Sequence, residues 1–278
     1  MAIRASVLRK TIILLLLVWL ILLMILYLSS GKYRELGIEV LKTQLDKNLK
    51  TEIQIKREDI HFSIIKNFPN ASVRLENILV KSVPGPDYSE FRFAGKDTLL
   101  FAEKADLVLD LWSLLTKKYV LKRINLEEGI INLLSDSREL VNYNVWKDSD
   151  PDDTLPDLVE YSIREIEFKN MNLNYLDTKI KLKCSGTIDK AEASGNFMDD
   201  DFRFHVRAVT SGNMVSYENR IIKHHKPLTS RFDIERAGDL YLLNDGVFET
   251  FGLPLELTLT YNIASTEYDI KCRIKSAA

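Results

Sequence analysis

Cysteine and histidine are scarce in this chain of 278 residues, which contains two of the first and four of the second. Two cysteines, Cys184 and Cys272, are too few for a disulfide framework. They leave open one long-range bridge, or two small apolar side chains on the hydrophobic sides of strands, which we favour. The pair His224 and His225 lacks the H-E-x-x-H spacing, so we expect a surface loop there rather than a metal site.

The sequence also lacks the motifs of common enzyme classes. It contains no G-x-S-x-G, no G-x-x-x-x-G-K-[ST] and no G-x-G-x-x-G. We therefore expect no enzymatic activity and no cofactor. The formal net charge is −2, and nothing favours nucleic acid, whose recognition calls for a basic stripe.

Charged residues are absent from residues 11–30, TIILLLLVWLILLMILYLSS. About twenty helical residues span roughly 30 Å, the thickness of the hydrocarbon core of a bilayer. The segment predicts an N-terminal transmembrane helix, the membrane anchor, which includes Ile12, Leu16, Trp19, Leu23 and Tyr27. A cleaved secretory signal is the alternative, but the apolar run is longer than usual and no A-x-A-like site follows it.

The charges around this segment predict its orientation. Arg4, Arg9 and Lys10 precede it, and no acidic residue occurs among the first ten. By the positive-inside rule the N-terminus stays in the cytoplasm and the rest of the chain is exported.

Helical periodicity is rare after the anchor. Residues 35–49 place apolar side chains at helical spacing and predict a short amphipathic helix outside the membrane. Beyond residue 50, only residues 112–118 could form a helical turn. The stretch DSDPDDTLPD, residues 148–157, predicts a solvated loop or linker, since five aspartates and two prolines do not pack into a sheet.

Most of the remaining chain alternates apolar and polar residues with a period of two. The alternation is clearest in residues 107–111, 180–184, 202–208, 255–263 and 268–274, and it predicts strands with one apolar side. Residues 120–134 predict two strands, broken near Glu127 to Gly129. One echo is visible, because Ile124, Leu126, Gly129, Ile131 and Leu133 share their spacing with Ile166, Phe168, Met171, Leu173 and Tyr175.

These strands must cover their apolar sides without helices. A second sheet can face the first and form a dry β-sandwich. Alternatively, one long sheet curls into a groove whose apolar lining is filled by lipid. Each large apolar side chain left in water forgoes roughly 1.5–3 kcal/mol, so an empty groove is untenable. The pattern alone does not separate the two folds.

A set of motifs follows the predicted amphipathic helix. Ile53 and Ile55 precede FPNASVRLENILV in residues 68–80, and residues 107–115 end in a double leucine. A run of the form L-x-x-I-x-L-x-x-G-x-I-x-L then starts at Leu121, and Asn144 and Trp146 close the region. With the anchor, residues 8–147 resemble the AsmA-like family of bacterial envelope proteins, in its Bacteroidetes branch. Members are usually longer, so we expect this chain to be a truncated member.

The resemblance implies a chorein-like start to a groove of repeated β segments. The expected fold is therefore mostly β: a transmembrane helix and a short amphipathic helix, then a long, curved, largely antiparallel sheet with an apolar-lined groove. The expected regions are 1–31, cytoplasmic N-terminus and anchor; 32–147, AsmA-like region; 148–158, acidic loop or linker; and 159–278, continuing groove.

The resemblance also implies a function. We expect a single-pass protein of the bacterial inner membrane, mostly periplasmic, that binds or conducts phospholipid between membranes in outer-membrane biogenesis. Envelope proteins are further expected partners. The residues predicted to line the groove are Leu107, Leu109, Ile180, Leu182, Phe202, Phe204, Leu255, Leu257 and Leu259. The alternative is a non-enzymatic periplasmic scaffold or assembly factor for outer-membrane proteins.

Overall fold

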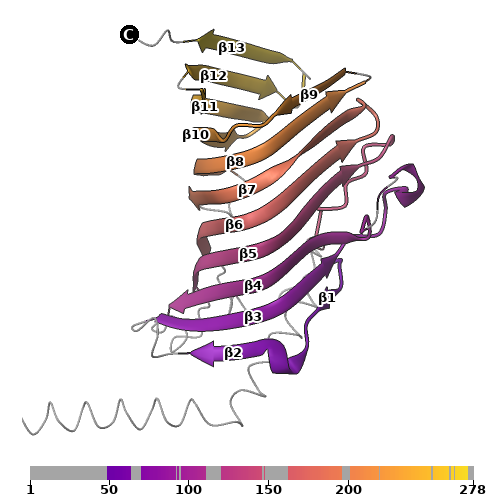
Figure 1. Ribbon diagram of the computed structural model, residues 1–278, viewed down its shortest axis with the longest axis vertical. Coiled ribbons are helices and arrows are strands. Elements are labelled where there is room, and N and C mark those ends of the chain that lie inside the picture. Colours follow the sequence, from indigo (N-terminus) through magenta and orange to yellow (C-terminus); the bar gives the residue numbers. More distant parts are fainter. Residues whose placement is uncertain are drawn as a thin grey trace, which may run out of the picture.

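The computed structural model describes residues 49–63, 70–91, 93, 95–110, 120–145, 147, 162–195, 201–218, 220–251, 253–262, 264–265 and 267–274. These residues form thirteen strands of one large curved sheet that does not close on itself (Figure 1). The strands are β1 (Ile53–Gln54), β2 (Ile60–Ser63), β3 (Asn70–Lys81), β4 (Thr98–Asp110), β5 (Val120–Ser135), β6 (Ser162–Asp177), β7 (Leu182–Gly195), β8 (Arg203–Tyr217), β9 (Arg220–His224), β10 (Leu228–Ala237), β11 (Leu240–Thr250), β12 (Leu253–Asn262) and β13 (Tyr268–Ile274). Two short 3₁₀ helices accompany them, η1 (Arg57–Asp59) and η2 (Tyr88–Glu90).

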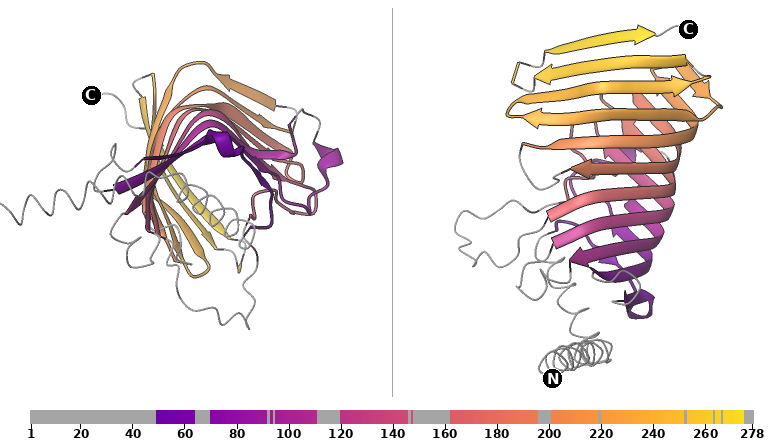
Figure 2. Two further views of the ribbon diagram at one scale, coloured as in Figure 1. Left: turned by 90° about the horizontal axis from the view of Figure 1, so that it is seen from below. Right: turned by 90° about the vertical axis from the view of Figure 1, so that its left-hand side faces the viewer.

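The strands follow one another along the sheet in the order β1-β3-β4-β5-β6-β7-β8-β10-β11-β12-β13, with β2 beside β3 and β9 beside β8. Eleven strands at about 4.8 Å spacing make a sheet roughly 50 Å long. Figure 2 shows the sheet as a single curved layer. The predicted mostly β fold with a long curved sheet is therefore confirmed. Because every described strand belongs to this one sheet, the described residues do not form the two facing sheets of a sandwich.

Only β5 and β6 pair in parallel, and all other neighbouring strands of the described sheet are antiparallel. The register of this parallel pair explains the echo in the sequence. Its five spaced residues lie directly beside their counterparts, from Ile124 beside Ile166 to Leu133 beside Tyr175. Equal spacing in two neighbouring parallel strands places both apolar sets on one face.

A line of backbone bends crosses the first half of the sheet. Asn77 in β3, Glu128 in β5 and Asn170 in β6 all have a positive φ, between 52° and 56°. At each bend the alternation shifts by one residue while the strand continues and keeps its register with its neighbours. The predicted break near Glu127 to Gly129 is therefore wrong, since β5 runs through it as one strand of 16 residues.

Several sequence predictions fall outside the described residues. These are the anchor with Ile12, Leu16, Trp19, Leu23 and Tyr27, nearly all of the amphipathic helix, the turn at residues 112–118, and the acidic stretch at residues 148–157. Within the described ranges, no helix is both long enough and apolar enough to cross a membrane.

Candidate functional site

One row of register partners crosses eleven strands of the sheet. In each strand, the member of this row is apolar except for one serine. Directly paired residues point to the same side of a sheet, so the row defines one face, which we call the apolar face. From β2 to β13 its members are Ile60, Leu75, Ala105, Leu126, Phe168, Ala191, Ala208, Ser230, Phe248, Leu255 and Ile274.

A second row lies two residues along each strand and is apolar throughout. It runs from Val73 in β3 to Phe232 in β10. Its intermediate members are Leu107, Ile124, Ile166, Ala193 and Val206. The apolar face is therefore continuous in both directions, along the strands and across them.

The alternate residues form a polar face. One of its rows contains Arg74, Asp106, Asn125, Glu167, Glu192, Arg207, Arg231, Val247, Glu256 and Arg273. Two neighbours in this row, Arg74 and Asp106, form an ion pair at 2.8 Å. This division of the two faces is the physical basis of the period-two pattern in the sequence.

Burial divides the apolar face into two halves. In β2 to β7, the packed half, Ile60, Ala102 and Met171 are 0% exposed and belong to one hydrophobic cluster. In β8 to β13, the open half, Leu253 is 48% exposed and Ile274 is 70% exposed. The side chains that remain available to an apolar ligand therefore concentrate in the open half.

Seven of the nine predicted lining residues lie on strands of this face. Leu107 and Leu109 in β4 pack against the hydrophobic cluster of the packed half. Leu182 begins β7 and pairs with the exposed Tyr217 of β8. Leu255, Leu257 and Leu259 follow one another along β12, in register with Ile274, Cys272 and Ile270 of β13. The sequence thus placed these six residues on one face.

The seventh residue on this face is Phe204, and the other two predicted residues precede strands. Phe204 lies in β8, and the ring of Phe202, just before that strand, stacks on it with centroids 4.5 Å apart. Ile180 lies in the turn between β6 and β7, where its backbone N–H donates to Asp177 Oδ1 at 3.1 Å. The strand predicted from Ile180 therefore begins two residues later, because the aspartate side chain holds a turn.

Two aromatic residues of the apolar face were missed. Phe232 in β10 and Phe248 in β11 stack with centroids 5.8 Å apart. In β11 the alternation shifts at Asp245, whose φ is 49°, and β10 pairs with β11 through a bulge at the same level. The irregular register removed the period-two signal from this part of the sequence. Alternation of Phe232 with Ile234 is the one signal that could have revealed β10.

Both cysteines are free thiols on the apolar face. Cys184 pairs with Tyr175, and Cys272 pairs with Leu257. The two residues lie five strands apart, roughly 24 Å, well beyond the reach of a disulfide. Burial raises the pKa of the Cys184 thiol. The interpretation as small apolar side chains on strands is confirmed.

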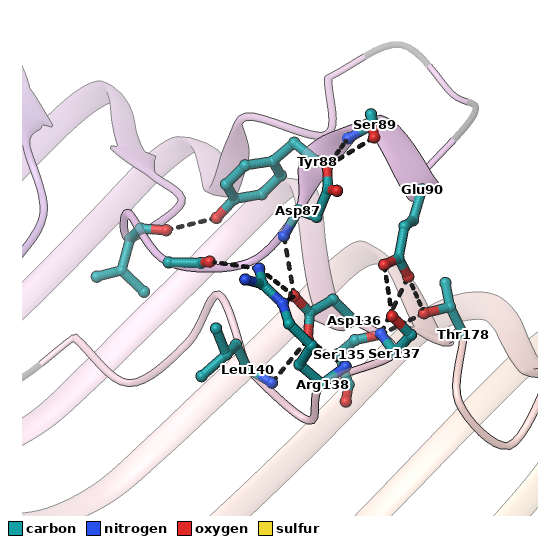
Figure 3. A network of polar contacts seen from close by, with 12 residues as sticks. Asp87, Tyr88, Ser89, Glu90, Ser135, Asp136, Ser137, Arg138, Leu140 and Thr178 are labelled. Atoms are coloured by element: carbon teal, nitrogen blue, oxygen red, sulfur yellow. Dashed lines mark hydrogen bonds and ion pairs between the residues drawn. The ribbon is translucent and has the colours of Figure 1, made fainter.

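A network of polar contacts joins three connections between strands, where the strands end on one side of the sheet (Figure 3). We call it the edge latch. The buried carboxylate of Asp136 accepts hydrogen bonds from the backbone N–H groups of Asp87, Arg138 and Leu140, and from the Arg138 guanidinium. Beside it, Glu90 accepts from Ser137 and Thr178. The latch thus joins the β3–β4, β5–β6 and β6–β7 connections.

The edge latch depends on an ionised Asp136. Burial would raise the pKa of this carboxyl, but the hydrogen bonds from Asp87, Leu140 and Arg138 outweigh it and lower the pKa to about 2. A folded-state pKa below the unfolded value means that the ionised carboxylate stabilises the fold above about pH 4. That contribution is lost as the pH falls from about 4 towards 2.

We predict that Asp136→Asn lowers the thermal unfolding midpoint at pH 7 and flattens its dependence on pH between 4 and 2. The amide supplies one neutral acceptor where the carboxylate receives three N–H groups and a guanidinium. Circular dichroism of the two proteins across this pH range measures both effects. The control is Glu139→Gln, whose exposed ion pair with Lys179 contributes little. Equal pH profiles for native protein and Asp136→Asn would contradict the role of the latch.

Two histidines of the described chain contact single polar side chains, and a third is exposed. His224 Nε2 lies 2.6 Å from the Thr250 hydroxyl, and His225 is exposed. His205 Nδ1 lies 2.7 Å from Asp233 on the polar face. Among the described residues, no group of three histidine, cysteine, aspartate or glutamate side chains could hold a metal ion.

Comparison with known proteins gives no assignment. No protein-family model matches this sequence, and no curated protein matches it.

Proposed function

We propose that this protein holds phospholipid acyl chains against the apolar face of its sheet and belongs to the AsmA-like bacterial envelope proteins. One observation carries the proposal: an apolar row that continues through eleven strands of a single open sheet. A water-soluble sheet does not keep a continuous apolar face uncovered, because exposed contiguous apolar area favours binding or aggregation.

In this proposal the apolar face lines the inside of the curve and forms a groove. The difference in burial supports this placement. Curvature brings the side chains on the inner face together and spreads those on the outer face, and the side chains that pack into a cluster are those of the apolar face. The charged residues on the other face, such as Arg74 and Arg123, keep partly exposed ion pairs.

The open half is the part of the groove that we assign to lipid. There, large apolar side chains are exposed: Val215, Tyr217, Ile222, Leu253, Tyr261, Tyr268, Ile270 and Ile274. Covering each of these would recover up to roughly 1.5–3 kcal/mol. Acyl chains laid across β8 to β13 meet this need, while their headgroups stay in water.

The sequence supplies the proposed location. The uncharged residues 11–30 and the basic residues before them support an inner-membrane tether with the sheet in the periplasm. A protein anchored there that carries lipid would serve the supply of phospholipid to the outer membrane. The scaffold alternative requires a sealed core with a local docking patch, and a face that stays apolar through eleven strands favours the lipid.

The test compares lipid carried by native and altered full-length protein. The double variant Leu253→Asp and Leu257→Asp places two carboxylates on the apolar face of the open half. The control, Ser216→Asp and Thr258→Asp, adds the same charge on the polar face of β8 and β12. Each protein is extracted in mild detergent, and bound phospholipid is measured by mass spectrometry.

We expect phospholipid with the native protein and the control, and a several-fold loss with the apolar-face variant at unchanged circular dichroism. Native protein without lipid would end the proposal. Collapse of the fold in the apolar-face variant would instead favour a sealed core, and with it the scaffold.

A further inference from the structure

An open depression of about 800 Å³ crosses β8, β10, β11, β12 and β13. Its lining combines two rows of the polar face with the residues between them. One row is His205, Asp233, Thr258 and Lys271; the other is Arg207, Arg231, Val247, Glu256 and Arg273. Between them lie Val206, Phe232, Gly246, Leu257 and Cys272.

The membership of the lining places the depression on the polar face. The intervening residues belong to the apolar face, yet their own apolar neighbours, such as Phe204, Ala208 and Leu255, are not part of the lining. A hollow on the apolar face would be lined by those neighbours, since residues two apart share a face. The two polar rows therefore form the walls, and the strands between them form the floor.

Two arginines face each other in one wall. Arg207 of β8 and Arg231 of β10 are direct register partners, so their Cβ atoms lie about 4.5–5.5 Å apart. Like charges in this position destabilise a sheet. Neither guanidinium forms an ion pair or hydrogen bond within the described residues, and Glu192, the other register partner of Arg207, forms no ion pair with it.

In β8 and β10, the carboxylate next to these arginines is that of Asp233, which already has two partners. Asp233 accepts from Arg203 at 3.0 Å and lies 2.7 Å from His205 Nδ1. Burial would raise the pKa of Asp233, but these two contacts outweigh it and lower the pKa. Asp245 and Glu256 also line the depression, on β11 and β12. Among the described residues, no carboxylate forms an ion pair with Arg207 or Arg231 at the β8–β10 end.

We propose that the depression binds a phosphate-type oxyanion between Arg207 and Arg231. The guanidinium fork matches the geometry of phosphate oxygens and can donate two parallel hydrogen bonds to them. An anion held by both arginines removes their mutual repulsion. The site lies on the face opposite the proposed lipid groove, so it does not depend on acyl-chain binding.

Titration of the full-length protein with inorganic phosphate, followed by isothermal calorimetry at low ionic strength, tests the site. A parallel titration uses glycerophosphoglycerol, the soluble headgroup of a phospholipid, to distinguish a free phosphate from a lipid headgroup. Saturable binding of either ligand supports the site, and the tighter of the two identifies the source. We expect Arg207→Gln with Arg231→Gln to reduce the affinity at least about tenfold.

The matched control removes two charges outside the depression, through Arg220→Gln and Lys223→Gln on β9. It should keep native affinity. The Arg207 and Arg231 variant should also melt no lower than native protein, because it relieves repulsion, and its melting temperature should not rise with added phosphate. Absence of binding by both ligands, or equal losses in the two double variants, would overturn the proposal.

Discussion

Replacing Met171 with aspartate is expected to unfold the sheet. Met171 is 0% exposed and lies in β6 between Gly129 of β5 and Ile188 of β7, within the hydrophobic cluster. A carboxyl group there loses its water and gains no partner, which costs about 2–7 kcal/mol even in the neutral form, and loss of the buried methionine packing costs about 2–5 kcal/mol more. Since a typical domain has about 5–15 kcal/mol of stability, most of the protein should lose its β-sheet signal in circular dichroism at 25 °C.

The conservative variant Met171→Leu separates charge from packing. It keeps an apolar side chain of similar volume and should cost less than about 1.5 kcal/mol. A folded Met171→Asp protein with a native melting temperature would show that the packed half is open to water. In that case the distinction between the two halves of the apolar face would be wrong.

The substitution Gly129→Ala is expected to be almost as damaging, for a steric reason. A Cβ at position 129 would lie 1.9 Å from the carbonyl oxygen of Phe101 and 2.9 Å from the Cα of Ala102, both backbone atoms of β4. No rotamer change relieves such a contact, so β4 and β5 must separate at the bend next to Glu128. We expect a loss of about 3 kcal/mol or more, measured by chemical denaturation.

Gly186 in β7 provides the comparison. There a Cβ would first meet the side-chain oxygen of Asn213, at 2.5 Å, which can turn away, while the nearest backbone atom lies at 3.3 Å. Gly186→Ala should therefore cost clearly less than Gly129→Ala. Equal denaturation midpoints for the two alanine variants would mean that the backbone of β4 does not lie against position 129 of β5.

These experiments bear on the proposed function through the division of the apolar face. Acidic substitutions should unfold the protein in the packed half, at Met171, and leave it folded in the open half, at Leu257. Lipid binding requires this difference, because a face that is equally sealed everywhere has no room for acyl chains. A face equally open everywhere would leave β2 to β7 without a core.

Many strands of the sheet could be predicted from the sequence, because a sheet with one apolar face and one polar face requires apolar and polar residues to alternate. Leu107 with Leu109, and Leu255 with Leu257, were placed on one face by alternation alone. The echo between residues 124–133 and 166–175 also reported a structural relation, the parallel pair β5 and β6. Where a backbone bend shifts the alternation, as at Glu128 and Asp245, the sequence signal failed.

The sequence by itself determined that the described chain is built of strands with one apolar and one polar side. Side-chain chemistry and a two-residue period are local properties, so each strand carries them independently. Only the tertiary structure decided that these strands join into one curved sheet, with apolar residues in register from Ile60 to Ile274. Pairing and register depend on contacts between distant segments, and the same pattern would equally allow two facing sheets. The burial difference between the two halves, and the facing pair of Arg207 and Arg231, arise from that pairing alone.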